Sequence, residues 1–142
     1  MHDERIAHLI KNAFRGTSGA LQRRLREHSL LYGHWTLLRI LWQSDGMTQR
    51  QLSEQAGVKE SSTFTALQAM EKQGYVKRRK IASNNKQVRV FLTAKGRALR
   101  SRIVPMAQEV NRIALKGVSA KDLGATRRTL LRVIANLSAD AW

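Results

Sequence analysis

Apolar residues recur at helical spacing along most of this chain, and one segment shows the alternating pattern of a strand instead. Apolar residues recur at helical spacing over residues 6–25 and again after residue 93, whereas over residues 75–92 they alternate with polar ones. A period of 3.6 residues lines one face of a helix, and strict alternation lines one face of a strand. Because Pro105 is the only proline, long helices are permitted nearly everywhere. The pattern therefore predicts a mainly helical chain with one small β hairpin.

Local signals set the boundaries of six expected helices. Thr48 stands three residues before Gln51, the spacing of a capping box, in which two side chains satisfy backbone amides at a helix start. Gly57 then suits the left-handed conformation that ends a helix. Ser119 with Asp122 opens the last helix. The expected helices cover about residues 4–27, 35–42, 48–56, 60–73, 93–116 and 119–137.

The helix over residues 60–73 has two different faces. Phe64, Leu67 and Met70 form an apolar stripe that we expect to be buried. The opposite stripe is polar and poor in acidic residues. After this helix, two short strands with a turn between them are expected to form a hairpin. The strands cover residues 75–80 and 87–92, and the turn consists of Ser83, Asn84 and Asn85.

Two short helices joined at a glycine and followed by a basic hairpin form the pattern of a winged helix-turn-helix. The two helices here are those over residues 48–56 and 60–73. In such a pair the second helix enters the major groove of DNA, where polar side chains can hydrogen-bond to base edges. The expected fold is therefore mainly α with a small β wing.

The charge of the chain favours a polyanionic partner. Its 26 Lys and Arg residues outnumber its 10 Asp and Glu residues, which gives a formal net charge of +16. The densest run, over residues 77–89, contains six basic side chains and no acidic one. A basic run alone fits a solvated face as well as a binding surface. The adjoining helix pair is what favours double-stranded DNA.

The candidate DNA-binding residues form two groups. Polar side chains of the helix over residues 60–73 are assigned to base reading and its lysine to phosphate, the alternative being that they only fill an exposed helix face. They are Ser61, Ser62, Thr63, Thr65, Gln68 and Lys72. Arg50, at the preceding helix start, and the hairpin side chains are assigned to phosphate or the minor groove. The hairpin candidates are Lys77, Arg78, Arg79, Asn84, Asn85, Lys86 and Arg89.

The remaining helices carry apolar stripes but have no role in base reading. One reading helix contacts about one half-site, so residues 1–33 and 94–142 are interpreted as a dimerisation region that spaces two reading helices about 34 Å apart over a palindrome. The alternative is that they only cap the core of a monomer. We expect a single domain over residues 1–142, with residues 34–93 as the DNA-binding region.

Other function classes have little support in the sequence. The absence of cysteine excludes disulfides, thiol nucleophiles and Cys-ligated zinc. The four histidines and ten acidic residues show no metal-ligand spacing and no catalytic motif, so we expect neither an enzyme nor a metal or cofactor site. No apolar run is long enough to span a bilayer, and the first residues do not resemble a secretory signal. A cytoplasmic protein without a membrane partner is expected.

Together these segments resemble the MarR family of transcriptional regulators. The resemblance extends from about Leu31 to Gly96, with compatible flanking helices. It rests on HWTLLRIL at residues 34–41, LSEQAGVKESSTFTALQAMEKQGYV at residues 52–76 and FLTAKG at residues 91–96, in this order and spacing. The resemblance implies an obligate homodimer of winged helix-turn-helix protomers, usually a repressor of a nearby operon that is released by a small, often aromatic or phenolic, ligand.

The sequence departs from the family pattern at two places. Where the family commonly has an Asp-Arg pair at the wing tip, this chain has Asn84 and Asn85, followed by Lys86. The resemblance then implies that Lys86 supplies the charge in the minor groove and that Asn85 supplies a hydrogen bond there. Lys59 replaces the serine that often caps the recognition helix, so a weaker cap is expected.

The segment YGHWTLLRIL, at residues 32–41, is similar to family members that control the degradation of aromatic acids or their coenzyme A thioesters. In the family the effector lies between the dimer helices and the reading head, which implies cations for an acidic group and aromatic side chains for a ring. The alternative to ligand binding is burial in the core for Trp35, and a surface or salt-bridge role for Arg15 and Arg39. The implied ligand-binding residues are Arg15, His28, Tyr32, His34, Trp35 and Arg39.

A sequence-independent architectural DNA-binding protein is the alternative function. Such a protein would share the charge and the salt dependence of binding. It would not need a polar reading face or a ligand pocket.

Overall fold

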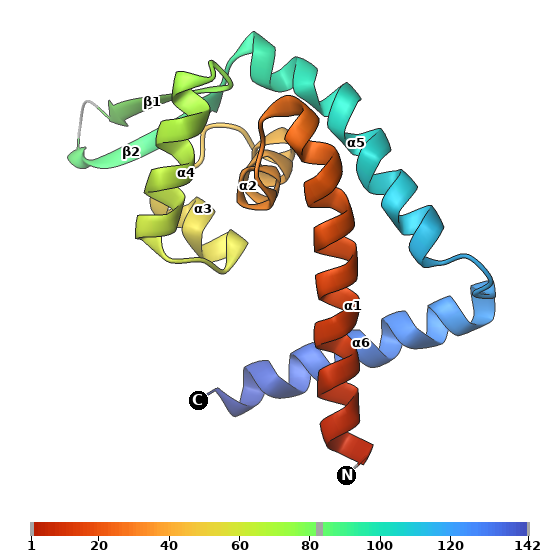
Figure 1. Ribbon diagram of the computed structural model, residues 1–142. Coiled ribbons are helices and arrows are strands. Elements are labelled where there is room, and N and C mark those ends of the chain that lie inside the picture. Colours follow the sequence, from red (N-terminus) through yellow and green to blue (C-terminus); the bar gives the residue numbers. More distant parts are fainter. Residues whose placement is uncertain (1, 82–83, 142) are drawn as a thin grey trace. The chain divides into compact units, whose positions relative to one another are not determined.

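A computed structural model describes the backbone of residues 2–81 and 84–141, and the side chains of residues 2–4 and 84–86 lie outside the described part. The described residues form six α-helices, one short 3-10 helix and one two-stranded antiparallel sheet (Figure 1). The mainly helical fold with a small β wing is therefore confirmed. The elements are α1 (His2–Leu25), η1 (Arg26–His28), α2 (Tyr32–Gln43), α3 (Gln49–Ala56), α4 (Glu60–Lys72), β1 (Val76–Ile81), β2 (Asn84–Leu92), α5 (Ala94–Ala114) and α6 (Ala120–Asp140).

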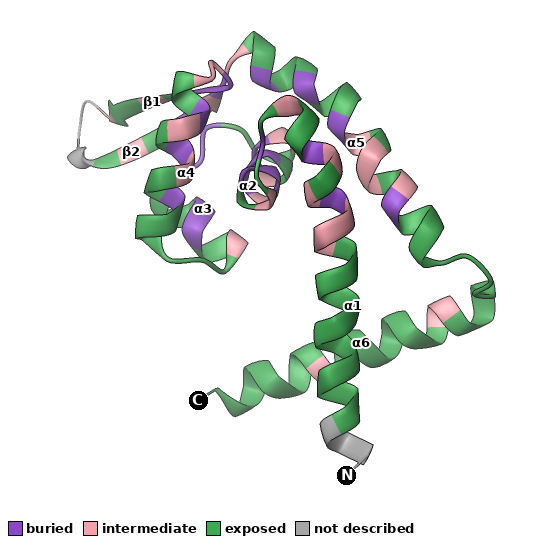
Figure 2. Cartoon of the chain, viewed as in Figure 1, coloured by how far each residue is buried: buried purple, intermediate pink, exposed green. Residues whose placement is uncertain are grey.

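The chain divides into two compact units, Met1–Val110 and Asn111–Trp142. The second unit holds the end of α5 and all of α6, which Ser119 caps by accepting a hydrogen bond from the amide of Asp122 at 3.1 Å. No described residue of α6 is buried within the chain (Figure 2). None of the described helices is long and apolar enough to cross a membrane. The expectation of a single domain over residues 1–142 stays a prediction.

The core of the first unit lies where α2, α3 and α4 meet. Burying each leucine or methionine side chain there contributes about 1.5–3 kcal/mol relative to leaving it exposed. Figure 2 shows the buried positions on the facing sides of these helices. The fully buried side chains include Leu38 and Leu41 of α2, Leu52 of α3, and Leu67 and Met70 of α4.

The boundaries of α3 follow the predicted signals. Thr48 Oγ1 accepts a hydrogen bond from the amide of Gln51 at 3.1 Å, and Gln51 Oε1 accepts one from the amide of Thr48 at 3.0 Å. Gly57 ends the helix at φ +68°, where a side chain would be strained. By contrast, the Lys59 side chain makes no capping hydrogen bond to α4. The tight connection brings α4 against α3.

The hairpin is anchored to the segment between α2 and α3. The amide of Gly46 donates to the carbonyl of Val90 at 3.0 Å, and the amide of Val90 donates to the carbonyl of Met47 at 2.8 Å. Sequence analysis missed this added pairing. It was also wrong about the turn, because Asn84 and Asn85 belong to strand β2, while Ser83 lies outside the described residues.

The start of α5 packs tightly against the end of α4 and the start of β1. Thr93 Oγ1 accepts a hydrogen bond from the amide of Gly96 at 3.0 Å, which caps the helix. A Cβ atom on Gly96 would lie 2.1 Å from the carbonyl oxygen of Tyr75, so only glycine fits there. Trp42 Nε1 also donates to the carbonyl of Gly96 at 3.0 Å. These contacts hold α5 against α2 and the hairpin.

A buried histidine closes the start of α2. The amide of Leu31 donates to His34 Nδ1 at 3.2 Å, and His34 is only 6% exposed. Burial lowers the pKa of His34 from its ordinary value. The neutral imidazole is therefore the form that fits the folded protein, because a protonated Nδ1 cannot accept this hydrogen bond.

We expect a His34→Asn variant to lose part of the acid sensitivity of folding. The folded state holds neutral His34 to a lower pH than the unfolded chain does, so unfolding takes up a proton as the pH falls below about 6.5. The free energy of unfolding should then decrease in that range, with no such contribution at higher pH. Asparagine offers an acceptor in place of Nδ1 but does not titrate.

Urea unfolding at fixed protein concentration from pH 8 to pH 5 measures this effect. Below about pH 6.5 the free energy of unfolding of the wild type should decrease more steeply than that of the variant. Parallel curves over the whole range would show that His34 does not titrate in this way.

Candidate nucleic-acid interface

Helix α4 presents a polar face that no other described element covers. Ser61, Thr65, Gln68 and Lys72 follow one another at spacings of three and four residues, and all are exposed. Thr65 Oγ1 donates to the carbonyl of Ser61 at 3.0 Å, so its hydroxyl oxygen and its methyl group remain available to a partner. This face matches the predicted reading stripe.

For two residues of α4 the observed burial is the reverse of the predicted burial. Thr63 is fully buried, and its Oγ1 accepts a hydrogen bond from Ser53 Oγ of α3 at 2.8 Å. Phe64 is instead 45% exposed. The prediction that Thr63 contacts DNA is therefore wrong, because a buried hydroxyl that already serves to join α3 and α4 cannot reach a base. The buried stripe is Thr63, Leu67 and Met70, whose spacings of four and three residues also fit one face of a helix.

The hairpin has one apolar face and one cationic face. In the antiparallel register Lys77 lies opposite Phe91 and Arg79 opposite Arg89, while Val76 and Val90 belong to the other, buried face. The guanidinium carbon of Arg79 lies 5.5 Å from the ring centroid of Phe91, so the charges of Arg79 and Arg89 lie on the same outer face of the hairpin. Lys77, Arg79 and Arg89 are all exposed. One nitrogen of Arg89, Nη1, donates to the carbonyl of Gly46 at 2.8 Å.

Arg78 differs from its basic neighbours because it lies on the core side of the hairpin. Its Nη2 donates to Glu71 Oε1 of α4 at 3.1 Å, its amide donates to Glu71 Oε2 at 3.1 Å, and its Nη1 donates to Gln49 Oε1 of α3 at 3.4 Å. Its side chain is only 17% exposed. The prediction that Arg78 contacts phosphate is therefore wrong, since its guanidinium is committed to partners on α3 and α4. The hydrogen bond from that guanidinium lowers the pKa of Glu71.

The other predicted phosphate contacts lie at the edges of this surface. Arg50 pairs with Glu54 at 3.3 Å, but both side chains are largely exposed, so solvent screening leaves that pair weak and the guanidinium accessible. At the wing tip, the backbone of Asn84, Asn85 and Lys86 forms the start of β2, and their side chains lie outside the described residues. Their predicted roles stay predictions.

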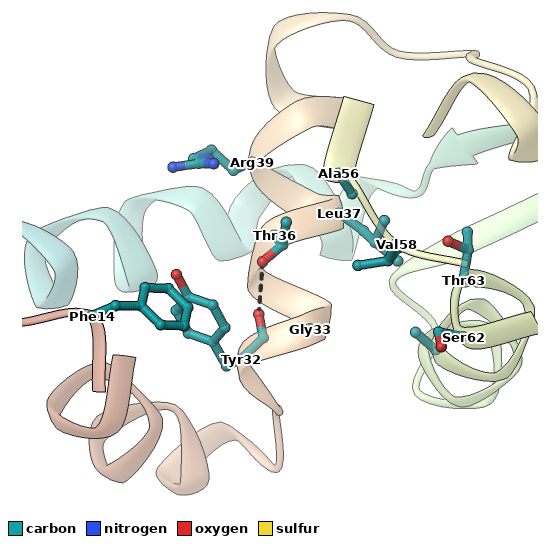
Figure 3. Close-up of a pocket in the computed structure, with 11 residues that line it drawn as sticks. Phe14, Tyr32, Gly33, Thr36, Leu37, Arg39, Ala56, Val58, Ser62 and Thr63 are labelled. Carbon is teal, nitrogen blue, oxygen red and sulfur yellow. Dashed lines mark hydrogen bonds between the residues drawn. The ribbon is translucent and has the colours of Figure 1, made fainter. Parts of the chain in front are cut away.

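A cavity of about 460 Å³ lies beside α4 (Figure 3). Phe14 and Tyr32 form one wall, in an edge-to-face contact with ring centroids 6.0 Å apart. Arg39 stands at another side, and Ser62 of α4 also lines the space. The remaining lining residues are Gly33, Thr36, Leu37, Ala56, Val58, Thr63 and Ala66.

Only part of the predicted ligand set lies around this cavity. Tyr32 and Arg39 do, whereas Trp35 belongs to the core at 8% exposure and contacts Trp42 edge to face. His34 is likewise buried, and it lines a separate groove together with Ser61 and Thr65. The cavity lining does not include Arg15 or His28. Sequence analysis missed Phe14, Thr36, Val58 and the cavity position of Ser62, although the helical spacing of Tyr32 and Thr36 offered one signal.

Comparison with known proteins shows what this chain is similar to. The model of the MarR family matches residues 30–88. A curated relative, the HTH-type transcriptional regulator TtmR of Methylorubrum extorquens (strain PA1), is 24% identical over 135 residues, which cover 95% of this chain and 66% of TtmR. This chain thus spans slightly less than two thirds of the length of that relative.

Solved structures show the same fold over almost the whole chain. The transcriptional regulator SlyA superposes with a TM-score of 0.84 at 28% identity, covering 95% of each chain. A MarR-family regulator from Listeria monocytogenes, solved in complex with a 26mer DNA, superposes with a TM-score of 0.84 at 22% identity, covering 94% of this chain and 89% of its own. These relatives are named as regulators, in agreement with the prediction that the chain is not an enzyme. The chain is thus similar to MarR-family transcriptional regulators in sequence over residues 30–88 and in its winged helix-turn-helix fold.

Proposed function

We propose that this protein is a dimeric repressor that binds a palindromic DNA operator and is released from it by a small acidic aromatic ligand. The observation that carries the proposal is the exposed polar face of α4 beside a hairpin on which Arg79 and Arg89 stand directly opposite each other. Such a surface offers hydrogen-bonding groups for base edges and cations for phosphate. The DNA bound by the Listeria relative supports the same use of the fold.

The dimer is supported by apolar side chains that the single chain leaves uncovered. On α1, Leu9 is 61% exposed and Phe14 is 57% exposed, and on α6 Ile134 and Leu137 are 60% and 64% exposed. Exposed apolar faces of this extent mark interaction sites. We infer that residues 1–33 and 94–142 form the dimer interface, and that residues 34–93 of each protomer read one half-site.

Release by a ligand is supported by the cavity beside α4. Its aromatic and aliphatic walls suit a planar ring, and the guanidinium of Arg39 suits a carboxylate. Because Ser62 lies on the recognition helix itself, a ligand in this cavity would touch the DNA-reading element directly.

The division of roles between α4 and the hairpin can be tested with two alanine variants. Thr65→Ala should weaken binding to promoter DNA from the protein's own locus by roughly ten- to a hundredfold and leave the affinity for random duplex unchanged. Arg79→Ala should weaken binding to every duplex and reduce the slope of log affinity against log salt by about one. Fluorescence anisotropy over a salt series measures both quantities. A uniform loss in Thr65→Ala, or an unchanged slope in Arg79→Ala, would contradict this division.

The dimer interface can be tested on the apolar stripe of α6. An Ile134→Asp Leu137→Asp double variant should sediment as a monomer, because a carboxylate cannot be buried there without a partner. The matched control is Ala125→Asp, an exposed position on the opposite side of α6, which should leave the dimer intact. If the double variant sediments as a dimer, this stripe is not the interface.

The cavity can be tested by screening aromatic acids and their thioesters for release of the protein from DNA. For an active acid, Arg39→Gln should raise the concentration required at least about tenfold, because the charge-assisted hydrogen bond is lost. Arg100→Gln, at an exposed arginine of α5, is the control and should respond as the wild type. Equal responses of the wild type and both variants would remove Arg39 from the ligand site.

A further inference from the structure

Phe64 is a large apolar side chain on the accessible side of the recognition helix. It lies three residues after Ser61 and four before Gln68, so it shares their side of α4, and it is 45% exposed. The other large apolar residues of this helix that the sequence grouped with it, Leu67 and Met70, are fully buried. A single exposed apolar residue is common on protein surfaces and indicates nothing by itself.

The ring of Phe64 packs against one charged side chain of the hairpin. The guanidinium carbon of Arg78 lies 5.0 Å from the ring centroid, in cation–π geometry. Arg78 is itself fixed by hydrogen bonds to Glu71 and Gln49. The ring thus rests on a fixed support while almost half of the residue remains accessible, so a partner can bind it with little loss of side-chain entropy.

The support also leaves Arg78 unsuited to a phosphate role. Its charge is balanced by Glu71 at 3.1 Å, and its side chain is 17% exposed. The element that faces the partner at this point is therefore the aromatic ring and not the cation below it.

We propose that Phe64 reads thymine, through contact of its ring with the C5-methyl group in the major groove. This inference rests on the proposed function, in which α4 enters that groove. Each base pair presents hydrogen-bonding groups there, but only thymine adds a methyl group, and apolar side chains are the ones that contact it. Ser61, Thr65 and Gln68 supply hydrogen bonds on the same helix, and Phe64 supplies the apolar contact that they lack.

The test begins with a duplex selected by the wild-type protein from a random library. Each thymine of one half-site is then replaced singly by deoxyuridine, which lacks only the C5-methyl group. At one position this replacement should weaken wild-type binding by about fourfold, the value of one buried methyl-sized group. Phe64→Ala should bind the thymine and uracil duplexes equally at that position, while any effect of uracil elsewhere should persist.

Two further variants separate the contact from a general loss of binding. Phe64→Leu should retain part of the thymine preference, because leucine preserves an apolar surface at this point. Thr65→Ala, on the same face of α4, should bind more weakly but keep the full thymine preference at that position. Circular dichroism of Phe64→Ala should match the wild type, and its melting temperature should be only slightly lower, because the variant loses part of a buried ring and its contact with Arg78.

The outcomes distinguish this inference from the proposed function. If a sequence is enriched but no uracil effect depends on Phe64, the inference is overturned and base reading by α4 stands. If no sequence is enriched, base reading as a whole is overturned, and Phe64 with it. A thymine preference that disappears in Phe64→Ala and survives in Thr65→Ala supports the inference.

Discussion

The hydrogen bonds of Arg78 hold the hairpin against α3 and α4, and so position the two parts of the candidate DNA surface, the polar face of α4 and the cationic face of the hairpin. Its guanidinium joins Glu71 of α4 and Gln49 of α3, and its amide binds the second oxygen of Glu71. The hairpin is held from the other strand as well, because Val90 pairs with the segment before α3. The recognition helix and the cationic face of the hairpin are thus presented on one rigid support, which a groove-binding protein requires.

The same arrangement explains why the basic residues of the hairpin have different roles. Alternation along β1 sends Lys77 and Arg79 to the outer face and Arg78 toward α4. On the outer face Arg79 and Arg89 are paired in the strand register, with Arg79 over the ring of Phe91 and Arg89 hydrogen-bonded to the carbonyl of Gly46. On the inner face, Arg78 hydrogen-bonds to Glu71 and Gln49 and contacts the ring of Phe64. In the proposed function, phosphate binding and the support of α4 are therefore assigned to adjacent residues of one strand.

Local features such as helix caps could be predicted from the sequence, whereas the sides of α4 and of the hairpin that are buried could not. The capping box of Thr48 and Gln51 depends on neighbouring residues only, so it was predicted correctly. The burial of Thr63 depends on Ser53 of another helix, and helical spacing alone cannot choose between a stripe that contains Thr63 and one that contains Phe64. The basic run alone does not show which face of the hairpin Arg78 occupies, whereas alternation from the buried Val76 puts Arg78 on the inner face.

Competition binding tests sequence-specific recognition most directly. Labelled promoter DNA from the protein's own locus is bound at fixed salt and displaced with either the same unlabelled promoter or random duplex of equal length. If α4 reads bases, random duplex should be needed at about a thousandfold higher concentration or more. Equal displacement by both competitors would contradict base reading and favour a protein that binds DNA only through its phosphates.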